Sequence, residues 1–148
     1  MIFERFARPL MILLTLLLVT ACSEPIPDEV RIRQRIEAMA QATVDKDLDA
    51  AIEPVHEDFL GNSYMRKINL KSMLRVSFYR YEKLHAIVQG IEVSVNGEEA
   101  EVKCNVVLAG GQEFIPERGK VLRVKSKWQK IEGDWFVVSA SWRDPLLR

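Results

Sequence analysis

The chain has 148 residues, which is enough for one folded domain and too few for two ordinary ones. Hydrophobic residues make up 48% and charged residues 28%, as in a typical globular protein. Basic and acidic residues balance at 21 each, so there is no reason to expect a nucleic-acid partner, whose binding requires clustered positive charge.

The first 21 residues predict a signal peptide. Arg5 and Arg8 give a basic start, and the apolar run at 10–19 is shorter than the roughly 20 residues that a membrane span requires. A retained membrane anchor is the alternative interpretation. Removing residues 1–21 takes away Arg5, Arg8 and Glu4 and leaves 19 basic and 20 acidic residues.

An aliphatic residue, two small residues and a cysteine follow, at Val19–Cys22. This pattern resembles the lipobox of bacterial lipoproteins. The resemblance implies cleavage before Cys22, a diacylglyceryl thioether on its sulfur and an acyl chain on the new amino terminus, which together would hold the protein stably on a membrane. Ser23 stands where an Asp would favour the inner membrane. We therefore expect the outer membrane, with the domain facing the periplasm.

The segment 22–27 is expected to be the lipidated cysteine and a short tether. Pro25 and Pro27 favour an extended polyproline-type conformation. Such a tether spans only about 15 Å, so the domain at 28–148 should lie close to the membrane surface.

Three amphipathic helices are predicted next, from apolar residues at helical spacing after residues that can cap a helix. The expected caps are Asp28, Asp47 and Asn69. The expected ranges are 28–46, 48–55, with Pro54 in the last turn, and 70–81. Residues 56–63 are expected to form an irregular or short extended stretch.

Beyond Lys83 the apolar residues alternate, as in strands. Four strands are expected, at about 87–95, 100–108, 122–128 and 135–142. Asn96-Gly97 predicts a tight hairpin and Glu132–Asp134 a turn. The order predicts an α+β domain, with three N-terminal helices packed on a curved four-stranded antiparallel sheet. Trp135 and Val137 are assigned to the outer sheet face, through which the protein could form a homodimer.

Three segments carry a further pattern: Lys46–Ala51, Val55–Phe59 and Trp128–Val138. They contain a helix break before an Asp-Phe pair and a final Trp-to-Trp hairpin. In this order they resemble the nuclear-transport-factor-2-like superfamily, especially small bacterial members with a cystatin-like cone fold. The resemblance covers about Asp28 to Arg143. That superfamily includes isomerases, cyclases, dehydratases and proteins without chemistry, so it implies a fold and not a function.

The resemblance also implies a cone whose mouth can hold a small apolar ligand. Isomerases of the superfamily use an Asp base with a Tyr and a protonated Asp as oxyanion donors. Here the base position falls nearest Asn62, which is not basic, so no catalytic residue and no cofactor are assigned. The residues expected around the pocket are Phe59, Tyr64, Phe78, Trp128 and Trp142.

Polar candidates are few. His56 and Asp58 could form a polar site, although surface polar residues at a helix end are far commoner. Neither histidine lies at metal-ligand spacing from a cysteine or a carboxylate cluster, so no metal is expected. If Cys22 is acylated, Cys104 has no disulfide partner and is expected to be a buried small hydrophobe.

Two basic rows could rest against anionic lipid head groups. The alternative is a solvated face whose charges pair with neighbours. The rows are Arg66, Lys67, Lys71, Arg75, Arg80 and Lys83, and then Arg123, Lys125 and Lys127.

The sequence favours a membrane-anchored, periplasm-facing lipoprotein that binds a partner or ligand without catalysis. The alternative is a small enzyme or carrier that acts on an apolar molecule in the cone. A pocket of a few hundred Å³ with two converging polar groups would favour the alternative, and a cone filled by aromatic side chains would favour the first.

Overall fold

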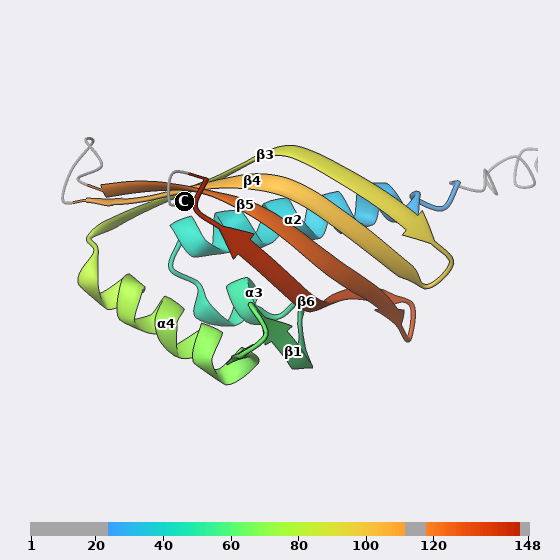
Figure 1. Ribbon diagram of the computed structural model, residues 1–148, viewed down its shortest axis with the longest axis horizontal. Coiled ribbons are helices and arrows are strands. Elements are labelled where there is room, and N and C mark those ends of the chain that lie inside the picture. The colour runs from blue at the N-terminus through green and yellow to red at the C-terminus, as the bar shows by residue number, and fades with distance from the viewer. Residues whose placement is uncertain (1–23, 112–117, 146–148) are drawn as a thin grey trace, which may run out of the picture.

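The computed structural model describes residues 24–111 and 118–145. The expected signal peptide and Cys22 lie outside the described residues. The described part contains three helices and six strands (Figure 1). In chain order they are α2 (Asp28–Val44), α3 (Leu48–Ile52), β1 (Val55–Gly61), β2 (Met65–Arg66), α4 (Lys67–Arg80), β3 (Lys83–Asn96), β4 (Glu99–Gly111), β5 (Arg118–Ile131) and β6 (Asp134–Arg143).

All six strands form one sheet in the order β2-β1-β6-β5-β4-β3. Strands β3 to β6 are an antiparallel meander, whereas β1 runs parallel to β6 and pairs antiparallel with the short β2. The α+β class is as predicted, but the expected four-stranded sheet is wrong because the stretch after Pro54 is a strand. The carbonyl of Pro54 accepts a 2.9 Å hydrogen bond from the Val137 amide, which aligns β1 along the edge of β6.

The predicted helix starts are partly correct. Asp47 caps α3, because its side chain accepts a 3.0 Å hydrogen bond from the Ala50 amide. Asp28 does not cap α2, since Pro27 precedes the helix and the Asp28 carboxylate contacts a distant strand. Asn69 lies inside α4, where its side chain accepts from the Arg66 amide, 3.1 Å away. The second helix ends at Ile52 and not at residue 55.

The sheet curves around α2, which lies along the inner face of β3, β4 and β5 (Figure 1). A bulge in β6 decides which side chains of that strand point inward. Trp128 pairs with Val137 and Lys127 pairs with Ser139, so Val138 is an extra residue that reverses the alternation. Trp135 and Val137, expected on the outer face, are therefore buried at 0% and 5% exposure.

The core lies between α2 and the inner face of the sheet. Burying apolar side chains here contributes about 25 cal/mol for each Å² removed from water. None of the helices in the described part of the chain is long and apolar enough to cross a membrane. The buried core residues are Ile32, Ile52, Val55, Phe59, Ala100, Val102, Trp128, Trp135 and Val137.

Candidate ligand pocket in the concave face of the sheet

An apolar pocket of about 220 Å³ lies between α2 and the inner face of the sheet. Alternate residues of β3, β4 and β5 contribute to its floor, because successive strand side chains point to opposite faces. The residues that line it are Ile36, Met39, Ala40, Thr43, Val55, Phe59, Leu70, Ala86, Val88, Cys104, Val106, Leu108, Val124, Ser126, Trp128, Val137, Ala140 and Trp142.

Large aromatic side chains line this pocket without filling it. The indole Nε1 of Trp128 donates a 2.9 Å hydrogen bond to Ser126 Oγ, which fixes the ring against the floor. The Trp142 ring lies over Gly61, where a Cβ atom would be only 2.6 Å from its Cη2. Phe59 completes this wall. These are three of the five aromatic residues that the sequence assigned to the cone.

The other two aromatic candidates do not line the pocket. Tyr64 is 73% exposed, because it follows β1 in the turn to β2. Phe78 is half-buried on α4 and is not among the residues that line the pocket. A periodic aromatic stripe on a helix indicates burial, but it does not tell which neighbouring element the stripe will contact.

The polar groups of the lining are few and already engaged. The Thr43 hydroxyl donates to the Met39 carbonyl at 2.9 Å, and the Ser126 hydroxyl accepts from Trp128. Burial raises the pKa of the Cys104 thiol, which therefore stays protonated and is a poor nucleophile. The described lining residues include no carboxylate and no imidazole. This chemistry suits an apolar ligand and lacks a general acid or base.

The predicted polar pair lies outside the pocket. His56 stands on β1 with its ring at the edge of Phe136, 6.3 Å between centroids, and its Nδ1 accepts from the Asp58 amide. The Asp58 side chain is 92% exposed. Asn62 is structural, because its Oδ1 accepts a 2.9 Å hydrogen bond from the Trp142 amide. No cluster of three potential metal ligands occurs in residues 24–111 and 118–145.

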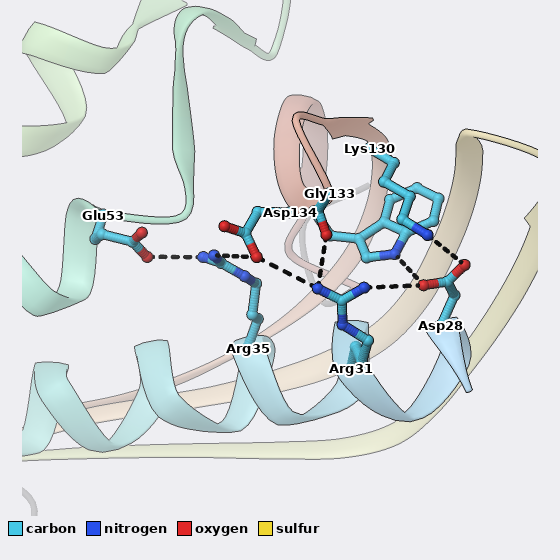
Figure 2. Close-up of polar contacts among 8 residues, drawn as sticks. Asp28, Arg31, Arg35, Glu53, Lys130, Gly133 and Asp134 are labelled. Carbon is cyan, nitrogen blue, oxygen red and sulfur yellow. Dashed lines mark hydrogen bonds and ion pairs between the residues drawn. The ribbon is translucent and has the colours of Figure 1, made fainter. Parts of the chain in front are cut away.

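Sequence reasoning missed a polar cluster between the start of α2 and the β5–β6 turn (Figure 2). The Asp28 carboxylate accepts from Trp135 Nε1 at 2.9 Å and forms an ion pair with Lys130 at 3.2 Å. Arg31 donates to the Gly133 carbonyl at 2.7 Å. The indole hydrogen bond, with Lys130, lowers the pKa of Asp28. The cluster holds the turn against the helix and lies outside the pocket.

A second arginine extends this cluster toward α3. Arg35 forms an ion pair with Glu53 at 2.7 Å, and its guanidinium also lies 5.3 Å from the centre of the Phe136 ring. Such a contact adds a modest cation–π attraction, about 0.5–1 kcal/mol at exposed sites. No local sequence signal could have paired residues so far apart in the chain.

No protein-family model and no curated protein matches this chain. Solved structures do. An NTF2-like protein of unknown function from Pseudomonas putida is 19% identical with a TM-score of 0.68, covering 79% of this chain and 86% of its own. A cystatin-like protein of unknown function from Nostoc punctiforme is 15% identical with a TM-score of 0.67, covering 83% and 96%. This chain has the nuclear-transport-factor-2-like fold.

A third nuclear-transport-factor-2-like structure, from Novosphingobium aromaticivorans, is 14% identical with a TM-score of 0.66, and the match covers 82% of this chain and 84% of that one. At such identities the likeness establishes the fold alone, because this fold supports many unrelated functions. The pocket and the surface of this chain are therefore the features that bear on its function.

Proposed function

We propose that this protein is a lipid-anchored envelope lipoprotein whose nuclear-transport-factor-2-like domain binds a small apolar molecule without transforming it. The observation that carries the binding role is the pocket itself, which is hollow, lined by apolar side chains and without a carboxylate or imidazole among its described lining residues. A binding role needs only a fitting apolar surface, whereas a catalytic role needs a positioned acid, base or nucleophile.

The pocket volume limits the ligand. Pockets for drug-sized molecules have volumes of about 300–1,000 Å³, and the volume here is about 220 Å³. A single ring system or a short stretch of an acyl chain fits such a space. The apolar lining gives affinity by burying the ligand's surface, and no polar anchor is required for it.

The anchor is supported by the sequence around Cys22. Only five residues separate this cysteine from Asp28, where α2 begins. Pro27 has φ −53° and ψ 144°, close to polyproline II, in keeping with an extended tether. The domain would then lie near the outer membrane on its periplasmic side, where it could take apolar molecules from the bilayer.

The anchor is tested by mass spectrometry of the mature protein and by palmitate labelling. We expect a triacylated Cys22 at the new amino terminus, and no label in Cys22→Ser. Cys104→Ser is the matched control and should stay labelled, because it keeps Cys22 and removes only a thiol that is buried in the folded domain. A mature form that is soluble without detergent and carries no fatty acid would overturn the anchor, whatever the pocket binds.

The binding role is tested with two neighbours on β3. Ala86 lines the pocket, while Ile87 points to the other face and is 52% exposed. Naphthalene and decanol serve as probes, with the fluorescence of Trp128 and Trp142 and titration calorimetry as readouts. Ala86→Phe should weaken binding about ten-fold or more, equivalent to about 1.4 kcal/mol, and Ile87→Phe should not. Equal binding by both variants, or no binding by the wild type, would contradict the proposal.

A further inference from the structure

We propose that the outer face of the sheet holds a second binding site, for phosphate ester groups, centred on Lys103, Lys125 and Lys127. We call this site the lysine groove. It lies on the face of the sheet opposite the apolar pocket and goes beyond the proposed ligand-binding function.

The lysine groove is a hollow of about 340 Å³ on the outer sheet face. Its lysines come from adjacent strands, Lys103 from β4 and the other two from β5, and all three are exposed. Their strand neighbours of opposite parity, such as Val102 and Trp128, are buried in the core. The residues that line the groove are Leu60, Asn62, Ser63, Glu101, Val102, Lys103, Lys125, Ser126, Lys127, Ser139, Ala140 and Ser141.

The strand register places like charges side by side. Lys103 on β4 is directly opposite Lys125 on β5. Lys127, which is opposite Glu101, is the diagonal neighbour of Lys103. Residues directly opposite in antiparallel strands have Cβ atoms about 4.5–5.5 Å apart, and like charges in that arrangement are destabilising. The next strand offers Lys125 no countercharge, because its partner on β6 is Ser141. In the next outward-facing pair of β5 and β6, Arg123 is opposite Arg143.

Two acids face the groove. Glu101 is opposite Lys127, and Glu92 on β3 is opposite Lys103. In the described part of the chain, neither acid forms an ion pair within 4.0 Å with a groove lysine. The ion pairs of that part lie instead around α2, α3 and β1. The outer face therefore carries an excess of positive charge that an external anion can neutralise. Its basic side chains are Lys103, Arg123, Lys125, Lys127 and Arg143.

The groups around the lysines match a phosphate ester. Lysine ammonium groups donate charge-assisted hydrogen bonds to phosphate oxygens. The lining includes the hydroxyl side chains of Ser139 and Ser141 and the amide of Asn62, which add neutral donors for the remaining oxygens. A free sugar or glycerol phosphate and a phospholipid head group present the same chemistry.

The same charges argue against a second copy as the occupant of the groove. A two-fold dimer brings one surface patch against its own copy. A two-fold axis through the paired Lys103 and Lys125 would place these cations against their own copies. A homodimer, which the sequence left as a possibility, would need an anion in the contact if it formed through this face.

The test uses the full lipidated protein in neutral detergent. The probes are glycerol 1-phosphate, micelles containing phosphatidylglycerol, and acetate, with calorimetry and the melting temperature as readouts. The variant is Lys103→Gln/Lys125→Gln. The control is Arg75→Gln/Arg80→Gln, which removes the same charge from exposed positions on α4.

We expect phosphate esters to bind the wild type and the control, and the lysine variant to bind about ten-fold or more weakly. In phosphate-free buffer, the lysine variant should be at least as stable as the wild type, because the cross-strand repulsion is gone. Binding of glycerol phosphate would assign a soluble ester, and binding only of phosphatidylglycerol a lipid head group. Equal binding by the lysine variant, acetate binding as tight as phosphate, or a less stable lysine variant would overturn the proposal.

Discussion

The indole Nε1 of Trp135 donates a 2.9 Å hydrogen bond to Oδ1 of Asp28, joining two residues 107 positions apart. Trp135 is fully buried, so its N–H group has no access to water and depends on this carboxylate. The first residue of α2 thereby holds the last hairpin of the sheet against the helix (Figure 2).

Removing the Asp28 carboxylate should destabilise the domain. Asp28→Ala leaves the Trp135 N–H group unpaired and should cost about 1.5 kcal/mol, the lower end of the range for hydrogen bonds to charged groups, because the carboxylate is partly exposed. Urea unfolding measures the difference. Glu29→Ala, the exposed neighbour in the same helical turn, is the control for the lost helix N-terminal charge. Equal losses in the two variants would show that only the charge matters.

The same carboxylate should make stability depend on pH. Its folded-state pKa is lowered by Trp135 and Lys130, so its contribution is present above the unfolded pKa and is lost as the pH falls through the folded pKa. The wild type should exceed Asp28→Asn in free energy of unfolding at pH 7. The difference should shrink below a pH of about 4, the usual range of an aspartate pKa. A difference that stays constant down to acid pH would contradict this origin.

Gly61 should not tolerate a side chain. A Cβ atom there would lie 2.6 Å from the Trp142 ring and 3.1 Å from Phe59, at the wall of the apolar pocket. Gly61→Ala should cost about 1–3 kcal/mol, as for overpacked cores. In a Trp142→Leu background the same alanine should cost less, since the two changes share one contact. Additive losses in thermal unfolding would mean that the clash with Trp142 is not the cause.

The reactivity of Cys104 measures how accessible the pocket lining is to a reagent in solution. Its thiol is buried and its pKa is raised by burial, so the reactive thiolate is scarce in the folded domain. If Cys22 is acylated as proposed, Cys104 is the remaining thiol of the two cysteines. Iodoacetamide at pH 8 should modify it about ten-fold or more slowly in the folded than in the urea-unfolded protein. Similar rates would show an open, mobile pocket, and mass spectrometry separates the two results.

Local signals in the sequence located several elements. Asp47 caps α3 because a cap needs only residues within one helical turn. The hairpin at Asn96-Gly97 is present, with its turn shifted by one residue to Gly97-Glu98, so that Asn96 pairs with Glu99. Alternating apolar residues placed the four long strands, although their ends extend beyond the predicted ranges. These features depend on neighbours in the chain.

The candidate sites depend on contacts between distant residues. One extra residue, Val138, reverses the alternation of β6 and turns Trp135 and Val137 inward, because pairing with β5 sets the register. The opposition of Lys103 and Lys125 across β4 and β5 follows from register in the same way.

By itself, the sequence determined the helices and the long strands, because hydrophobic period and capping are properties of short segments. The apolar cone was implied by the resemblance to the superfamily. Only the tertiary structure decided that the stretch after Pro54 adds strand β1 to the sheet beside β6, that Asp28 holds Trp135, and which aromatic side chains reach the pocket. These features depend on contacts between strands and helices that are far apart in the chain. No local sequence pattern determines the free energy of such contacts.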